Sequence, residues 1–346
     1  MSSTEAPLIL VINAGSTVTQ YALFAGEQQV AGDDVPTKES VEAMAEAGRR
    51  FLAEHGRQVA ELGAIVARGG ILRPIRGGVY SVNKAMIRDC LEHRYGRHAS
   101  NLGAPAAREL AGETGIAVLI ANPPTVDELS QEARTTGHPE IARRSVFHAL
   151  NQKAVAADMA AKLGKRYDEV RVIVVHMGGG LSVGAHRDGR VVDVNDALEG
   201  DGPFAMNRTG GLPGLGLVRW ARDKSIEEVT RVICRQGGFK AHLGTDDARE
   251  VERRVDAGEA QARQLFEAFT YHIAKAVAAL AIPLEGKVDG IALTGGLARW
   301  GQLVERLRER LAWLGPVHVY PGSREVEALA LAGLSVLNGE QPVQEY

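Results

Sequence analysis

A polar residue and a glycine turn follow a short β-branched run near the middle of this sequence. Residues 172–175 are Val-Ile-Val-Val, His176 follows them, and the chain returns in a second apolar run after Gly178, Gly179 and Gly180. Consecutive glycines leave the backbone amides uncovered, so that a phosphate can approach them closely. Taken alone, this stretch is compatible with a phosphate site and with an ordinary tight hairpin.

The same pattern occurs near the N-terminus. Residues 8–12 form an apolar run that ends in Asn13, and a small-residue turn with Ser16 and Thr17 leads into a returning strand. Asn13 and His176 therefore hold equivalent places in two copies of one strand–turn–strand unit. Such self-similarity predicts two like domains that face a cleft, and two phosphate-approaching turns suit a nucleotide.

Four further candidate residues stand at strand ends or in loops. Arg68 directly follows the predicted strand 62–67, which is unusual for a core arginine. Arg208 lies in a Gly/Pro-rich loop, where it suits bidentate binding of phosphate or carboxylate, or is a solvated loop arginine. Gly295 and Gly296, between a predicted strand and a helix, can hold a nucleotide through the backbone or simply begin the helix.

Other polar residues are ambiguous on their own. His148 falls in a predicted helix over residues 139–163, where a histidine is also common as a satisfied core residue. Asn122 follows the predicted strand 117–121 and precedes two prolines, so it either faces a site or caps a turn. Glu325 begins the closing helix, where a carboxylate favours the helix dipole as well as a metal ion. In open α/β sheets, ligands bind at the carboxyl ends of the strands.

Strands alternate with helices along the chain, which predicts an α/β architecture. The 346 residues suffice for two domains with full cores. We expect an N-terminal domain over residues 1–145, a C-terminal domain over 146–324, and a closing helix at about 325–346 that can pack back on the first domain. A long helix is predicted over residues 260–284, with its apolar residues on one face.

Composition excludes several classes of protein. The net charge is −3 with no long basic run, which argues against nucleic acid as a partner. No apolar stretch is long enough to span a bilayer, and the first residues lack the features of a signal peptide. Cys90 and Cys234 have no ligand-like neighbours, so we expect free thiols in a cytoplasmic protein.

Eight short motifs, taken together and in order, resemble those of butyrate kinases. The match runs from about residue 8 to residue 337. It is specific as a collinear set, although no single motif is. The motifs are INAGST at 12–17, ARGG at 67–70, HASNLG at 98–103, FHALNQK at 147–153, HMGGG at 176–180, DGPF at 201–204, LTGGLA at 293–298 and YPGS at 320–323.

The resemblance implies a fold and a reaction. Butyrate kinases are relatives of acetate kinase in the actin-like superfamily, with two RNase H-like domains and a nucleotide cleft between them. They use ATP and Mg²⁺ to phosphorylate a short or branched-chain carboxylate reversibly, giving acyl phosphate and ADP. The resemblance also implies a homodimer or higher homo-oligomer.

Roles follow from the resemblance motif by motif. It implies that Asn13, Ser16, Thr17, His176 and Gly178–Gly180 contact the nucleotide phosphates, and that Gly295 and Gly296 flank the adenosine. Arg208 and His148 would bind the transferring phosphoryl group, with Asn122 beside them. Arg68 and His98 would lie near the carboxylate. Glu325 and Asn122 would hold Mg²⁺.

Four positions depart from the family pattern. Val18 stands where a serine is usual, Gln20 where a lysine is usual, and Asn122 where an aspartate is usual. Asn207 stands where the family usually has a glutamate just before the phosphate-binding arginine. An asparagine carbonyl still ligates Mg²⁺, but it lacks the negative charge. Two hypotheses therefore remain: a working carboxylate kinase that is slow or has shifted metal needs, and a nucleotide-binding homologue that has lost phosphoryl transfer. A third keeps the fold but uses a different acceptor.

Overall fold

The computed structural model describes residues 6–15 and 17–346, which form two compact units. Unit 1 comprises Met1–Asp127 and Arg324–Tyr346, and unit 2 comprises Glu128–Ser323. The first boundary between the two units lies after Asp127, earlier in the chain than the boundary expected at residue 145. The reason lies in Glu128, whose carboxylate is bound within unit 2 by the Lys153 ammonium at 2.9 Å and the Val191 amide at 2.8 Å.

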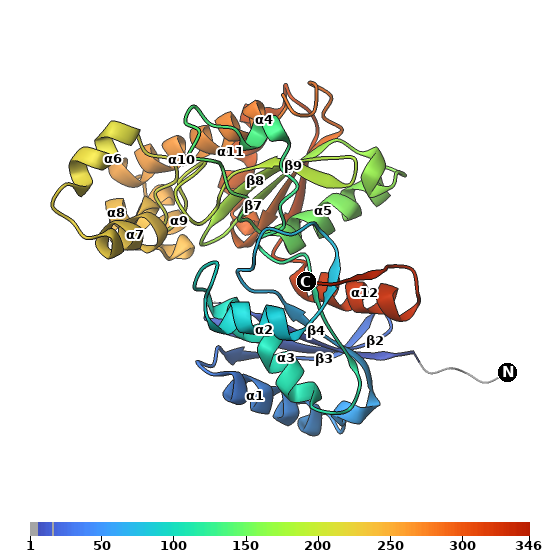
Figure 1. The fold of residues 1–346 in the computed structure, drawn as a ribbon. Coiled ribbons are helices and arrows are strands. Elements are labelled where there is room, and N and C mark those ends of the chain that lie inside the picture. Colours follow the sequence, from blue (N-terminus) through green and yellow to red (C-terminus); the bar gives the residue numbers. More distant parts are fainter. Residues whose placement is uncertain (1–5, 16) are drawn as a thin grey trace. The chain divides into compact units, whose positions relative to one another are not determined.

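Unit 1 is a mixed sheet with helices on both faces (Figure 1). The sheet order is β12-β5-β6-β4-β1-β2-β3, in which β1 pairs antiparallel with β2 and parallel with β4. Alternate residues of β1 are buried on opposite faces: Leu10 and Ile12 pack with α1 and α3, whereas Ile9 lies against Gly333 of α12. The elements are β1 Leu8–Ala14, β2 Val18–Ala25, β3 Gln28–Pro36, α1 Val41–Glu54, η1 Val59–Glu61, β4 Leu62–Arg68, β5 Val79–Ser81, α2 Lys84–Leu91, η2 Ala99–Leu102, α3 Gly103–Ala111, β6 Ala117–Ala121, α12 Glu325–Leu337 and β12 Val343–Gln344.

Unit 2 contains a five-stranded sheet in the order β11-β10-β7-β8-β9. The elements are α4 Gln131–Arg134, α5 Ala149–Lys162, η3 Tyr167–Glu169, β7 Val172–Met177, β8 Leu181–Arg187, β9 Arg190–Val194, α6 Gly214–Ala221, α7 Ile226–Arg235, α8 Gly238–Leu243, α9 Ala248–Asp256, α10 Ala260–Ala279, β10 Gly290–Gly295, η4 Gly296–Arg299, α11 Gly301–Leu311 and β11 Val317–Pro321.

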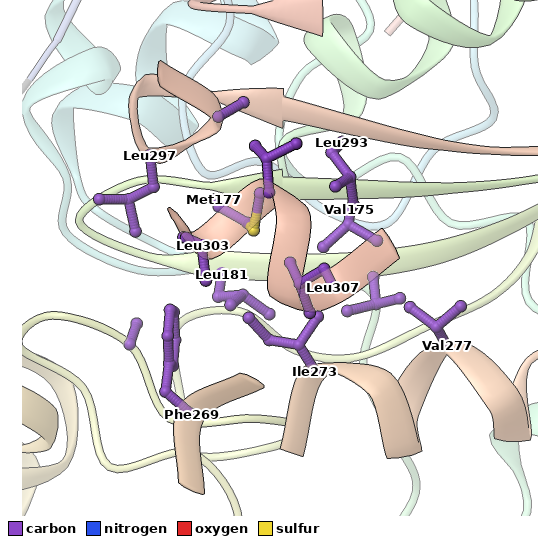
Figure 2. Close-up of a cluster of buried hydrophobic side chains, with 14 of the residues drawn as sticks. Val175, Met177, Leu181, Phe269, Ile273, Val277, Leu293, Leu297, Leu303 and Leu307 are labelled. Carbon is purple, nitrogen blue, oxygen red and sulfur yellow. The ribbon is translucent and has the colours of Figure 1, made fainter. Parts of the chain in front are cut away.

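The core of unit 2 lies on both faces of this sheet. On one face, Val175 and Leu293 pack against Phe269 and Ile273 of α10 and Leu307 of α11 (Figure 2). On the other face, Val172 and Val174 pack against α5. Burial on both faces explains why β7 reads as an uninterrupted apolar run rather than an alternating one.

The two sheets repeat one topology, as the paired sequence units predicted. Strands β3-β2-β1-β4-β6 of unit 1 and β9-β8-β7-β10-β11 of unit 2 have the same order and the same directions. The next-to-last residues of the first strands correspond: Asn13 pairs across the ladder with Gln20, and His176 pairs with Ser182. The α/β fold with two RNase H-like domains is therefore confirmed.

One predicted helix begins ten residues late. The helix expected over residues 139–163 is α5, Ala149–Lys162, and residues 142–146 have neither helical nor strand structure. Arg143 binds Asp193 at 2.8 Å and the carbonyls of Ala133 and Val194 at 2.9 Å, which holds this segment against β9. The long helix α10 likewise ends at Ala279 rather than at residue 284. None of the helices in residues 6–15 and 17–346 combines the length and apolar character that crossing a bilayer requires.

Candidate functional site

Asn13 of unit 1 lies at the centre of a buried polar cluster. Its Nδ2 donates to Gln20 Oε1 at 3.0 Å and to Glu325 Oε2 at 3.2 Å, and the residue is only 4% exposed. The Arg68 guanidinium donates to the same Glu325 oxygen at 3.1 Å. Asn13 Oδ1 is buried and has no hydrogen-bond partner among the described residues. The Glu325 carboxylate therefore contacts the Asn13 amide group, whose oxygen is unsatisfied within the described chain, and carboxylate and amide oxygens are both ligand types that Mg²⁺ takes.

The chain brings these residues together from three elements. Asn13 is the next-to-last residue of β1, Arg68 ends β4 next to it in the sheet, and Glu325 begins α12, which packs on both strands. A carboxylate in the first helical turn is favoured by the helix dipole, so Glu325 fits locally as well. Gln20 also donates to Asp34 at 3.0 Å, which ties its neutral amide into the β2–β3 ladder.

The turn between β1 and β2 is only partly described. Ser16 lies outside the described residues. Thr17 is exposed, and its carbonyl accepts a hydrogen bond from the Thr37 amide at 3.0 Å. The Gly15 amide donates to the Val18 carbonyl at 2.9 Å and closes the turn. The proposed contacts of Ser16 and Thr17 with phosphate stay predictions.

A buried asparagine, Asn101, lies between the loop that follows Arg68 and the segment that carries His98. Asn101 Oδ1 accepts a hydrogen bond from the Ile71 amide at 2.8 Å, and its backbone lies against Gly70. His98 is the N-cap residue of the short helix η2, and its Nδ1 accepts from the Ser100 amide at 3.2 Å. Asn101 thus connects the loop after β4 with the segment that carries His98. The sequence pointed to it only as a letter of the HASNLG motif.

Asn122 adopts a left-handed backbone conformation, with φ of +41°. Its Oδ1 accepts from the Gly78 amide at 2.9 Å, and its own amide donates to the Gly78 carbonyl at 3.0 Å. Asparagine is among the few residues that adopt this conformation readily. These contacts are those that the turn-capping alternative requires, and the role of Asn122 as a metal ligand stays a prediction.

In unit 2, His148 and His176 lie face to face. Their ring centroids are 3.8 Å apart and their planes differ by 7°. His148 precedes α5 and its Nδ1 lies 2.9 Å from Ser182 Oγ, whereas His176 Nδ1 lies 2.8 Å from Asn151 Nδ2. The structure therefore brings together two candidates that stand 28 residues apart in the sequence.

The glycine turn after His176 holds the side chain of Arg208. A Cβ on Gly180 would overlap the guanidinium of Arg208, so the absence of a side chain there makes room for it. Arg208 Nη1 donates to the Ala197 carbonyl at 2.6 Å, whereas its Nε is buried without a partner in the described chain. Burial lowers the pKa of Arg208 from its ordinary value. A buried cation held by a carbonyl is suited to receive an anion.

The glycines make unequal contributions to a phosphate site. The Gly178 amide donates to the Gly180 carbonyl at 2.9 Å within the turn, so it is already engaged. Gly179 has open space around its Cα. Gly295 ends β10, where its backbone exchanges two hydrogen bonds with Gly322, and Gly296 begins η4 with open space beside it.

Several residues of the site are absent from the sequence-based assignments. Asn151 and Gln152 follow His148 by three and four residues, and Ser182 lies opposite His176 in the ladder. The spacing in the FHALNQK motif was the available signal, because positions i, i+3 and i+4 share one face of a helix. No cluster of three or more His, Cys, Asp or Glu side chains that suits a metal ion occurs within residues 6–15 and 17–346.

The sequence and the fold agree with those of known carboxylate kinases. Residues 133–319 match the acetokinase family. The chain belongs to this family of carboxylate kinases, which confirms the resemblance seen in the motifs. Similar relatives are probable butyrate kinases from Oleidesulfovibrio alaskensis, 45% identical over 98% of both chains, and from Coprothermobacter proteolyticus, 42% identical over 98% of this chain and 99% of the relative.

Solved structures show the same fold. An acetate kinase from Porphyromonas gingivalis superimposes with a TM-score of 0.79 at 18% identity, covering 96% of this chain and 100% of the other. A propionate kinase from Francisella tularensis superimposes with a TM-score of 0.77 at 19% identity, covering 94% and 98%.

Proposed function

We propose that this protein is a carboxylate kinase of the butyrate kinase type. It would transfer phosphate reversibly from ATP to butyrate or a related short or branched-chain fatty acid, giving acyl phosphate and ADP in the cytoplasm. The observation that carries this proposal is the similarity, over 98% of the chain, to proteins named as probable butyrate kinases. The polar side chains at the strand ends of each unit are compatible with it.

The acceptor needs no general base. A carboxylate with a pKa of about 4–5 is ionised at neutral pH and attacks as it stands. What the protein must supply is positioning and stabilisation of the charge on the transferring group. We assign Arg208 and His148 to the phosphoryl oxygens, His176 and Gly178–Gly180 to the nucleotide phosphates, and Arg68 with His98 to the carboxylate.

The residues present fit a magnesium ion in unit 1. Asn13 Oδ1 is a buried acceptor without a hydrogen-bond partner in the part of the chain that the structure describes, and Glu325 Oε2 lies 3.2 Å from the amide nitrogen of the same side chain. Glu325 and Asn13 would hold the ion, directly or through water, and it would neutralise charge on the nucleotide phosphates when bound. The same Glu325 oxygen accepts a hydrogen bond from Arg68 at 3.1 Å, which orients the guanidinium that we assign to the acceptor carboxylate.

The competing proposal is a nucleotide-binding homologue without transfer. Gln20 carries no charge where the family has lysine, and Asn122 Oδ1 is engaged by the Gly78 amide. Both proposals require binding of adenine nucleotides, so binding alone does not separate them. Transfer to a carboxylate does.

The test is hydroxamate trapping of acyl phosphate with ATP, Mg²⁺ and straight and branched acids from acetate to hexanoate. We expect turnover that is highest with one of the four- or five-carbon acids and lower by roughly 10²–10³ in Arg208→Ala. Calorimetry with ADP and with ATP accompanies the assay. If the protein binds nucleotide but turns over none of the acids, the homologue without phosphoryl transfer is supported. If it neither binds nucleotide nor turns over any acid, both proposals are contradicted.

We also propose that the protein assembles as a homodimer through α6 and α7. Neither helix has a buried residue, and their large apolar side chains Leu215, Val218 and Ile226 are 70%, 66% and 81% exposed. Exposed apolar surface of this extent is typical of an interface. Light scattering should give twice the chain mass for the parent and a monomer for Leu215→Asp, and a monomeric parent contradicts the proposal.

A further inference from the structure

A buried chain of polar side chains continues inward from His148. Its ring Nδ1 lies 2.9 Å from Ser182 Oγ, and Gln152 Nε2 donates to the same hydroxyl at 2.8 Å. Gln152 Oε1 lies 3.1 Å from His186 Nε2, and His186 Nδ1 lies 2.8 Å from the Tyr167 hydroxyl. Ser182, Gln152 and His186 have no exposed surface. Buried polar chains of this kind persist because every member is hydrogen-bonded.

The strand β8 is built to accommodate the chain. Ser182, Gly184 and His186 alternate along β8, so their side-chain positions lie on one face, toward Gln152 of α5. A Cβ on Gly184 would overlap the Gln152 amide. Glycine at the middle position therefore lets Gln152 reach both of its partners.

The direction of the hydrogen bonds is determined at Gln152. Its Nε2 also lies 3.1 Å from the Ser182 backbone carbonyl, which only accepts, so this atom is the amide nitrogen. Oε1 therefore faces His186 and only accepts, which places a proton on His186 Nε2. Burial, and secondarily the charge of Lys153, lowers the pKa of His186 to about 3, so the ring is neutral and its Nδ1 accepts from Tyr167.

Ser182 determines which nitrogen of His148 carries the proton. Its oxygen accepts the Gln152 amide, and its own proton requires an acceptor. Among the described residues, His148 Nδ1 is the acceptor that lies within hydrogen-bond distance of this hydroxyl. If Nδ1 donated instead, the Ser182 proton would be buried without a partner, which is unfavourable. The ring of His148 therefore carries its proton on Nε2.

His176, which stacks on His148, also accepts a hydrogen bond at Nδ1, for an independent reason. Thr294 Oγ1 donates to the Gly322 carbonyl at 3.1 Å, so it accepts from Asn151 Nδ2 at 3.3 Å. That nitrogen also donates to His176 Nδ1 at 2.8 Å. With both Nδ1 atoms accepting, neither of the stacked rings needs a positive charge, which is consistent with their separation of 3.8 Å.

We propose that Ser182, oriented by Gln152, His186 and Tyr167, is a positioning residue that fixes His148 as the neutral tautomer with its proton on Nε2. A histidine's tautomer is set by the partner of its other nitrogen. His148 would then donate from Nε2 to an oxygen of the transferring phosphoryl group. This donation rests on the proposed function, whereas the tautomer does not.

The tautomer is measured directly by long-range ¹H–¹⁵N NMR of protein with labelled histidine. The His148 signals are assigned by their loss in His148→Gln. We expect the Nε2–H tautomer in the parent and a larger Nδ1–H population in Ser182→Ala. Gln152→Leu should act in the same direction by a smaller amount, because Ser182 then keeps its hydroxyl but loses the group that orients it.

Kinetics and controls complete the test. Ser182→Ala should lower kcat roughly tenfold, the effect of one lost hydrogen bond to the reacting group, with KM values changed by less than about twofold. Ser182→Thr, which keeps the hydroxyl, should preserve the tautomer and most of the rate. Thr270→Val removes another fully buried hydroxyl of unit 2, bound to the Glu267 carbonyl, and should change neither.

Two results would overturn the inference. One is the Nδ1–H tautomer of His148 in the parent, and the other is an unchanged tautomer in Ser182→Ala. An inactive parent that shows the expected tautomers refutes the proposed function and supports the positioning role of Ser182.

Discussion

Unit 2 should lose stability in mild acid through His186. Burial and Lys153 lower the pKa of this histidine from its ordinary value of 6.5 to about 3. As the pH falls below 6.5, the unfolded chain binds a proton that the folded ring does not. The contribution is therefore fully present above about pH 7 and is lost progressively as the pH falls toward 3.

The size of the effect follows from the two pKa values. Between pH 7.5 and pH 5, the unfolded histidine becomes almost fully protonated while the folded one stays neutral. This difference lowers the free energy of unfolding by about 2 kcal/mol at pH 5. Below pH 3 the loss levels off at about 5 kcal/mol.

Tryptophan fluorescence isolates the unit that carries His186. The three tryptophans, Trp220, Trp300 and Trp313, all lie in unit 2, so denaturant unfolding followed by their emission reports on this unit. The parent and His186→Gln are compared at pH 7.5, 6 and 5. The quantity of interest is the change with pH in each protein, because the substitution also alters the baseline stability.

The parent should lose about 2 kcal/mol more than His186→Gln between pH 7.5 and pH 5. His242→Gln, at an exposed histidine of the same unit, should behave like the parent. Equal losses in the parent and in His186→Gln would falsify the assignment of this acid sensitivity to His186.

Three further predictions concern the proposed active site. Arg208→Ala should lower kcat by roughly 10²–10³ with little change in the calorimetric affinity for ADP, because the guanidinium meets the transferring group rather than the nucleoside; parent-like turnover places Arg208 outside the site. Asn122→Asp should lower the Mg²⁺ concentration for half-maximal rate, since a carboxylate oxygen also accepts the Gly78 amide and adds negative charge; an unchanged Mg²⁺ titration means that the residue only caps the turn. Glu325→Gln should raise that Mg²⁺ concentration at least tenfold by removing the charged oxygen beside Asn13, and an unchanged value excludes Glu325 as a ligand.

Local sequence patterns determined the repeated core of the fold. The apolar runs before Asn13 and His176 are buried strands, and the small residues after them are the turns. Asp188 and Gly189 turn β8 into β9 with φ of +53° and +69°, as an Asp-Gly hairpin requires. Such features depend on neighbours in the chain, so periodicity and turn chemistry suffice to predict them.

The collinear motifs also identified the family, but not the partners of each side chain. The INAGST motif contains Asn13, and the YPGS motif lies just before Glu325, but nothing in the sequence links the two residues. The hydrogen bond between Asn13 and Glu325 joins residues 312 positions apart and exists only because α12 packs on β1 and β4. Likewise, no local sequence pattern indicates that the Arg208 guanidinium packs against the backbone of Gly180.

Tertiary contacts decided where the sequence alone was wrong or silent. Helical propensity favoured residues 139–148, but the bonds from Arg143 to β9 hold that segment in an irregular conformation. The buried chain from Tyr167 to His148 was also invisible, because alternate positions on β8 meet one face of α5 only after both have packed. A side chain's polar character is written in the sequence, whereas its hydrogen-bond direction depends on which partner the fold places beside it.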